Sequence, residues 1–107
     1  MINKLLECGI KEDTINKLKD NELDYLFEVN INNSIDIINY LKSINITNID
    51  ELLLSIPDLF FKPKEIVEDL FNKKNINELV NLINDDYSNI DLLFETWFYK
   101  FHMLYLK

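Results

Sequence analysis

Apolar residues recur at three- and four-residue spacing along most of the chain, as at Ile35, Ile38 and Leu41. This is the period of an α-helix with one buried face. The pattern predicts an all-α fold of about seven or eight short helices, either a solenoid-like repeat of helical hairpins or an irregular orthogonal bundle. We expect helices near residues 2–8, 12–20, 22–29, 34–44, 48–55, 64–72, 76–84 and 89–105, with a short turn at 57–61.

Two pairs of residues have the spacing of a helix N-terminus. Thr47 precedes Asp50 by three positions, and Ser88 precedes Asp91 in the same way. A hydroxyl side chain three residues before a carboxylate can satisfy the free N–H groups of a first helical turn. We therefore expect one helix to start after Thr47 and another to start after Ser88.

Two prolines interrupt the middle of the chain. Pro57 disfavours helical geometry at Ile56, and Pro63 suits the first turn of a new helix. The sequence predicts that the backbone leaves one helix before Pro57 and enters the next at Pro63.

A short motif recurs along the second half of the chain. Residues 48–53 read NIDELL, residues 75–80 read NINELV, and residues 89–94 read NIDLLF. The spacing between copies is uneven, so the third copy is either half of a repeat unit or a coincidence in a chain rich in Asn, Ile and Leu. The motif is typical of repeated helical hairpins within one domain, which we expect to span residues 1–107.

Composition supports a folded, acidic helical domain. Apolar residues make up 48% of the chain, which suffices for a core despite a net charge of −8. There is one Gly, and tight β-hairpin turns usually need more than this. Cys8 is the only cysteine, and Glu7 interrupts the apolar start of the chain, so neither an internal disulfide nor a signal peptide is expected. These features predict a cytoplasmic protein.

Residues 34–71 resemble one unit of the mitochondrial transcription termination factor helical repeat. The shared features are a first helix, a second helix that ends in Leu-x-x-x-Pro-x-Leu at residues 53–59, and a following helix that begins at Pro63. The resemblance implies a short right-handed solenoid of helix pairs, whose curved inner face in that family commonly contacts nucleic acid. This chain departs from the family because its 19 acidic residues outnumber its 11 basic residues, all of them Lys. Such a charge repels a phosphate backbone.

Local chemistry gives no indication of an enzyme. Cys8 is the only thiol and His102 the only histidine, and neither has a partner at metal-ligand or catalytic spacing. We interpret both as structural. We expect no catalytic residue, no cofactor, no metal and no small-molecule substrate.

Clustered charges have structural explanations. Acidic pairs suit first helical turns, a solvated helix face or a loop, and the only basic cluster brackets one predicted helix near its ends. The acidic pairs are Glu12-Asp13, Asp50-Glu51, Glu68-Asp69 and Asp85-Asp86, and the basic cluster is Lys62, Lys64, Lys73 and Lys74.

Aromatic residues concentrate at the end of the chain, where apolar side chains occupy nearly every face of the predicted helix 89–105. Such a helix is either the central core helix or a binding surface. Glu95 and Lys100 interrupt the run, so it does not predict a membrane span. The candidate partner-binding residues are Phe94, Trp97, Phe98, Phe101 and Tyr105.

Together these features predict a non-enzymatic interaction module that binds a partner protein, or a second copy of itself, through its curved face or its aromatic end. Two alternatives stay open. One is nucleic-acid binding, as the family resemblance implies. The other is an acidic mimic of nucleic acid that occupies a basic groove on a target protein.

Overall fold

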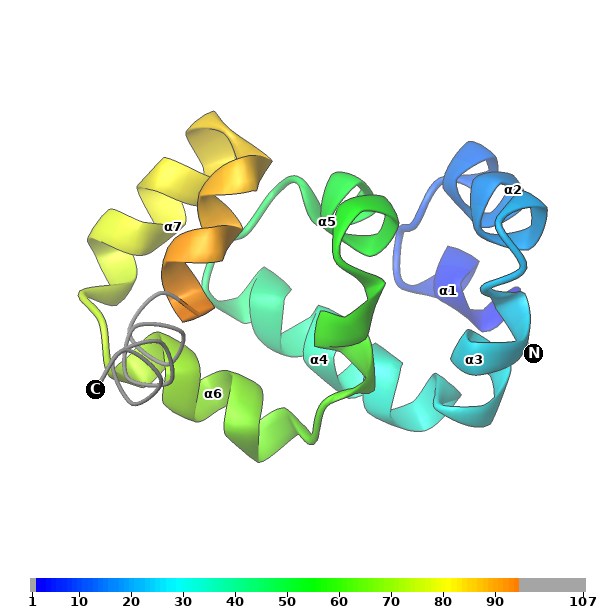
Figure 1. The fold of residues 1–107 in the computed structure, drawn as a ribbon, viewed down its shortest axis with the longest axis horizontal. Coiled ribbons are helices and arrows are strands. Elements are labelled where there is room, and N and C mark those ends of the chain that lie inside the picture. Colours follow the sequence, from blue (N-terminus) through cyan, green and yellow to red (C-terminus); the bar gives the residue numbers. More distant parts are fainter. Residues whose placement is uncertain (1, 95–107) are drawn as a thin grey trace, which may run out of the picture.

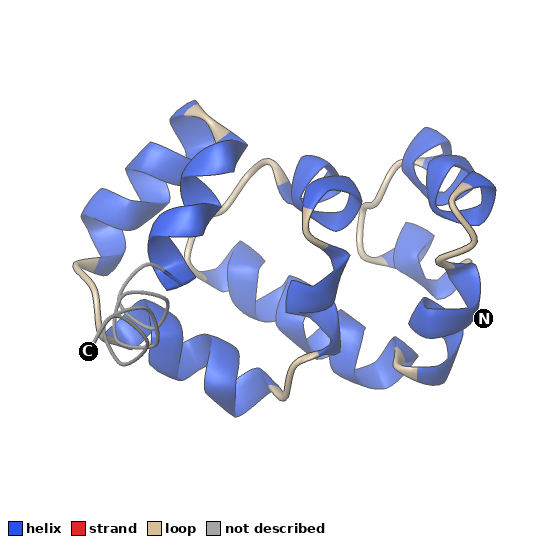
Figure 2. Ribbon diagram, viewed as in Figure 1, coloured by secondary structure: helices blue, strands red, loops and turns tan. Residues whose placement is uncertain are grey.

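The computed structural model describes residues 2–94 of the chain. These residues form seven α-helices and two 3₁₀-helices, and no strand occurs among them (Figure 2). The all-α prediction is therefore confirmed. The elements are α1 (Lys4–Glu7), α2 (Glu12–Asp20), α3 (Asp24–Val29), α4 (Ile31–Ser43), α5 (Ile49–Ser55), η1 (Pro57–Phe61), α6 (Lys64–Asn72), α7 (Ile76–Asp85) and η2 (Tyr87–Asp91).

The helices form an elongated stack of about 45 × 29 × 23 Å. Helices α2, α5 and α7 lie along one long side of the molecule, and α3, α4 and α6 lie along the other (Figure 1). The order α4–α5–η1 returns as α6–α7–η2, so two consecutive units have the same plan. The main contacts between helices of different units join α2 to α5 and α4 to α6.

The core runs between the two rows of helices, and α4 lies at its centre. Ile37, Ile38 and Leu41 of α4 are fully buried. Aromatic rings from both neighbouring elements complete this part of the core: Phe60 of η1 lies 6.4 Å from Phe27 of α3, measured between ring centroids. Burial of these side chains supplies most of the stability of such short helices, which are marginal in isolation.

Three helices end in the same left-handed turn. Gly9 (φ 90°), Glu22 (φ 60°) and Asn45 (φ 73°) each follow a helix with positive φ. In every case the next residue donates its backbone N–H to the carbonyl oxygen five positions earlier, which satisfies a helix-end acceptor. These bonds run from Ile10 to Leu5, from Leu23 to Leu18 and from Ile46 to Leu41.

The two prolines act as the sequence predicts. Helix α5 ends at Ser55, and Pro57 then begins the 3₁₀-helix η1. Pro63 is the N-cap of α6 and follows an extended residue, Lys62 (φ −76°, ψ 152°). The predicted break between these helices is confirmed, and the predicted turn at 57–61 is a short helix.

The two predicted hydroxyl caps are wrong. Asn48, not Thr47, occupies the N-cap of α5. The Thr47 hydroxyl instead donates to Asn84 Oδ1 at 3.1 Å, because α7 lies beside this turn. At the other position Asp86 is the N-cap of η2, and its carboxylate accepts the backbone N–H of Ser88 at 3.0 Å. A tertiary contact with Asn84 therefore takes the place of the predicted cap at Thr47, and the carboxylate of Asp86 takes the place of the predicted cap at Ser88.

Helix α4 begins three residues before its predicted start at Ser34. The Ser34 side chain is fully buried and donates to the carbonyl oxygen of Phe60 at 2.9 Å. It therefore joins α4 to η1 and does not cap α4. At the C-terminal side, the predicted start at residue 89 corresponds to η2, followed by a helical turn at residues 92–94.

The recurring Asn motif corresponds to a structural repeat in two of its three copies. Asn48 is the N-cap of α5, and Asn75 is the N-cap of α7, so both precede the second helix of a pair. Asn89 lies inside η2, where its side chain donates to the carbonyl oxygen of Leu82 at 2.8 Å. The third copy is therefore not equivalent to the first two.

Polar side chains join consecutive units. Asp50 of α5 accepts hydrogen bonds at its Oδ2 atom from the Lys11 backbone N–H at 2.9 Å and from the Thr14 hydroxyl at 2.7 Å. Asn84 of α7 accepts the Thr47 backbone N–H at 2.8 Å and donates to the carbonyl oxygen of Asn45 at 2.8 Å. Each polar residue thus fixes the second helix of one unit against the turn or helix of the unit before it.

Candidate interaction surface

The aromatic end of the chain begins within the described residues. Phe94 is half-buried in the helical turn that follows η2. The other predicted partner-binding residues, Trp97, Phe98, Phe101 and Tyr105, lie outside the described residues. Residues 87–94 run back beside α7 toward α6, as the orange segment in Figure 1 shows.

The turn at residues 92–94 separates two hollows in the surface. Leu93 is 1% exposed and belongs to the core. Its neighbours Leu92 and Phe94 are half-buried. Successive helical residues point about 100° apart, so these two side chains project to opposite sides of Leu93. Each of them lines a different hollow.

The larger hollow, which we name the α6 groove, has a volume of about 390 Å³. Ile66 and Leu70 of α6 and the ring of Phe94 provide its apolar lining. Ile66 is 48% exposed, which is high for an isoleucine beside a core. Lys62, Asp69 and Lys73 complete its wall.

The lysines at this end have distinct surroundings. The Lys62 ammonium lies 5.9 Å from the centroid of the Phe94 ring, within the range of a cation–π contact. Lys64 pairs with Glu68 on α6 at 3.4 Å, one helical turn apart. Lys73 follows the C-terminus of α6, where a positive charge is favoured by the helix dipole. These surroundings agree with the interpretation of the cluster as a solvated helix surface.

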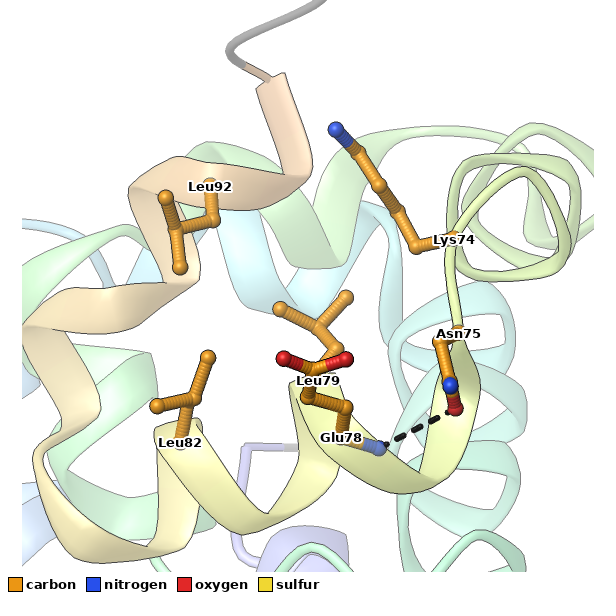
Figure 3. Close-up of a pocket in the computed structure, with 6 residues that line it drawn as sticks. All are labelled: Lys74, Asn75, Glu78, Leu79, Leu82 and Leu92. Carbon is orange, nitrogen blue, oxygen red and sulfur yellow. Dashed lines mark hydrogen bonds between the residues drawn. The ribbon is translucent and has the colours of Figure 1, made fainter.

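The smaller hollow, which we name the α7 hollow, has a volume of about 170 Å³. Figure 3 shows Leu92 on one side, with Leu79 and Leu82 on the other, all directed toward the same space. The Lys74 side chain extends along the rim. Asn75 caps α7 by accepting the Glu78 backbone N–H at 3.3 Å, which fixes the first turn of the helix that carries the two leucines.

Comparisons of the chain with protein-family models, with curated proteins and with solved structures give no match. The surface must therefore be interpreted from its own residues.

A second exposed apolar patch lies at the opposite end of the stack. Tyr25, Leu26 and Val29 of α3 are 69%, 41% and 58% exposed. These three residues are neighbours on one side of a helix of six residues, while Phe27 faces the core. Acidic residues interleave with them, since Asp24 and Glu28 belong to the same helix.

Chemical groups outside these surfaces have structural positions. Cys8 is buried, and burial raises the pKa of its thiol, so the nucleophilic thiolate is disfavoured. No cluster of three or more metal-ligating side chains occurs among residues 2–94. None of the helices described is both long enough and apolar enough to cross a bilayer.

The acidic pairs fall largely where the sequence places them. Glu12 and Asp13 lie in the first turn of α2, and Asp50 and Glu51 lie in the first turn of α5. Asp50 has a further role, since it accepts the hydrogen bonds from Lys11 and Thr14 described above.

Sequence reasoning missed the α6 groove. The signal is present in the spacing of α6, where Ile66 and Leu70 form a second apolar stripe beside Val67 and Phe71. Only the stripe of Val67 and Phe71 is fully buried. A helix with two adjacent apolar stripes needs neighbours on two sides, and this requirement points to the groove.

Proposed function

We propose that this chain is a non-enzymatic interaction module of the cytoplasm that binds a partner protein or a second copy of itself. The binding surface is the C-terminal end of the stack, formed by the α7 hollow and the aromatic segment that follows Phe94. The observation that carries the proposal is the exposure of Leu82, at 39%, beside the half-buried Leu92. Apolar surface of this kind, rimmed by charged residues, is typical of protein interfaces.

A protein partner fits this surface better than nucleic acid does. The chain carries a net charge of −8, and non-specific affinity for a phosphate backbone depends on basic side chains. The segment after Phe94 is rich in Trp, Tyr and Phe, which are enriched at protein interfaces, and Trp and Tyr combine a large apolar area with a polar group. We expect duplex DNA to bind no tighter than about 10⁻⁴ M at physiological salt.

Sedimentation equilibrium of the full chain over a wide concentration range tests the proposal. We expect a concentration-dependent dimer, or, if the partner is another protein, a salt-resistant and nuclease-resistant complex in pull-downs. The substitutions Leu82→Lys and Phe101→Ala should weaken that association by about tenfold or more, as truncation of central interface residues does. Tyr25→Lys, on α3 at the other end of the stack, is the matched control and should leave it unchanged.

Two results would contradict the proposal. One is a monomer at every concentration that also captures no partner. The other is a Phe101→Ala variant that unfolds while association of the Leu82→Lys variant is unchanged, because Phe101 would then belong to the core alone. Salt-sensitive micromolar binding of duplex DNA would favour the nucleic-acid alternative.

A further inference from the structure

Helix α3, at the N-terminal end of the stack, is anchored on its inner side and at its C-terminus (Figure 1). The fully buried Phe27 ring lies 6.4 Å from the Phe60 ring and 4.8 Å from the Phe61 ring, measured between centroids. At the end of the helix, the Asn30 side chain donates to the carbonyl oxygen of Leu26 at 2.8 Å. The outer face of α3 is therefore preformed, and a preformed surface binds at a lower cost in conformational entropy.

Two rows of side chains lie on this outer face. Tyr25 and Val29 form the first row. Each is two residues from Phe27, about 200° around the helix, so both point away from the core, and both are exposed. Asp24 and Glu28 form a second row beside the first, because residues four apart share one side of a helix. The patch thus combines an apolar row with an acidic row.

The sequence around this face carries charge of one sign. Between Lys19 and Lys42 the chain has no basic residue but several acidic ones. These are Asp20, Glu22, Asp24, Glu28 and Asp36. Helix α6 differs, because its exposed Ile66 lies within residues 62–74, where there are four lysines and three acidic residues. The exposed apolar side chains of α3 therefore belong to a purely acidic stretch, whereas that of α6 belongs to a stretch of mixed charge.

The acidic row determines which kind of occupant fits. It repels a phosphate backbone and an anionic membrane surface. A second copy would add the same negative charge to the contact, because a two-fold interface uses one patch on both molecules. A helix with an apolar row beside a row of lysines or arginines is complementary to both rows of α3, since rows of residues four apart interlock when helices pack.

From these observations we propose that the outer face of α3 is a docking site for a basic amphipathic helix of another protein. The apolar side of that helix covers Tyr25, Leu26 and Val29, and its basic side chains lie against Asp24 and Glu28. This site lies at the opposite end of the stack from the surface of the proposed function, so the inference does not depend on that function.

A labelled model peptide tests the inference. The probe is a fluorescein-labelled helical peptide of leucine and lysine, with leucines along one face and lysines beside them. Fluorescence anisotropy measures its binding to the full-length protein. We expect saturable one-to-one binding that weakens as salt rises, because exposed charges are screened. A peptide with glutamate in place of every lysine should not bind.

Two neutralised pairs of carboxylates locate the binding. The double variant Asp24→Asn/Glu28→Gln should weaken binding of the lysine peptide by about fivefold, the effect of losing two exposed charge pairs. The matched control is Glu65→Gln/Asp69→Asn on α6, which removes the same charge at the same spacing from exposed positions. This control should change the affinity by less than about twofold.

Substitution of the apolar row gives a second, independent measurement. Val29→Ser should weaken binding of the lysine peptide by about fivefold or more. Leu82→Ser, at the α7 hollow, is its matched control and should leave the affinity unchanged. Both side chains are exposed, so both variants should keep the far-ultraviolet circular dichroism of the unmodified protein.

Four results would overturn the inference. The first is a lysine peptide that does not bind. The second is equal weakening by the two neutralised pairs, because the peptide would then respond to net charge alone. The third is weakening by Leu82→Ser and not by Val29→Ser, which would move the peptide to the α7 hollow. The fourth is a Val29→Ser variant that loses self-association but binds the peptide normally, which would assign the patch to a second copy.

The two proposals can fail separately. The association at the C-terminal end is measured without the peptide, and the peptide affinity is measured at a protein concentration at which the chain is monomeric. A loss of one therefore gives no information about the other.

Discussion

The middle and the C-terminal end of the stack use the same kind of helix in different surroundings. In the middle, α4 buries a continuous face of five residues, including the hydroxyl of Ser34. At the end, α6 buries Val67 and Phe71 but leaves Ile66 exposed at the edge of a groove. The two helices carry similar apolar patterns, so the difference comes from position in the stack and not from the helix itself.

This contrast separates residues that hold the fold from residues that are available for binding. A fully buried side chain at the junction of two helices stabilises the fold through packing. A half-exposed side chain adds little stability until another surface covers it. In this molecule the available apolar surface lies at the two ends of the stack.

Phe71→Ala should have the largest effect. The ring is 0% exposed and contacts Tyr40 across the junction of α4 and α6, and removal of such a side chain costs about 3–5 kcal/mol. Urea denaturation followed by circular dichroism measures the change. A loss below about 1 kcal/mol would show that the junction is not tightly packed, and the contrast between the two flanks of α6 would fail.

Asn84→Ala should have an intermediate effect, because Asn84 bonds the end of α7 to the turn between α4 and α5. The substitution removes the hydrogen bonds to Thr47 and Asn45, with an expected loss of about 1–2 kcal/mol. Asn77→Ala, an exposed position on α7, is the control and should be nearly neutral. Equal losses in both variants would mean that the hydrogen bonds of Asn84 across the junction do not contribute to stability.

Ile66→Ala distinguishes an open flank from a covered one. If the groove is empty, a side chain that is 48% exposed should contribute less than about 1 kcal/mol. If the groove is covered in solution, the loss should exceed that of Val29→Ala on α3, which serves as the reference for an uncovered residue. The same urea titration measures both variants, and an equal loss in the two would show that this flank of α6 is open.

The pH dependence of stability should give the smallest effect. The backbone N–H and hydroxyl of Ser88 hold the pKa of Asp86 below its usual range. A lowered folded pKa means that the stabilisation is present above the unfolded pKa and is lost as pH falls through the folded value, which places the change below about pH 4. Asp86→Asn should reduce this acid sensitivity, as thermal melts between pH 5 and pH 2 can test. An unchanged acid profile would show that the cap contributes nothing measurable.

Much of the fold follows from the sequence because local signals and packing agree there. Pro57 and Pro63 act within a few residues, and the apolar period locates seven helices to within about three residues. The errors lie where a tertiary contact replaces a local one. Thr47 is of a residue type that often caps helices, but its hydroxyl donates to Asn84, 37 positions away. A partner at that distance cannot be predicted from the neighbouring sequence.

The candidate surface could be predicted only in part. The aromatic segment is evident from composition alone, whereas the groove depends on which of two apolar stripes on α6 meets α4. That choice is a property of the assembled stack, since Ile66 and Val67 are adjacent and similar in hydrophobicity. Sequence spacing shows that α6 needs two neighbours but does not show which flank lacks one.

The polar residues that join consecutive units also determine which parts of the molecule can unfold separately. Because the main contacts connect neighbouring units, the molecule behaves as a short linear array, and separation can begin at either end without disrupting the middle. Backbone amides of α4 should therefore exchange with solvent deuterium most slowly, and those of α1 and η2 most rapidly. The exchange rate of the backbone amides should change most sharply at Asp50 and at Asn84. The hydrogen bonds of each of these residues connect two consecutive units, and they must break before the unit beyond them can unfold separately.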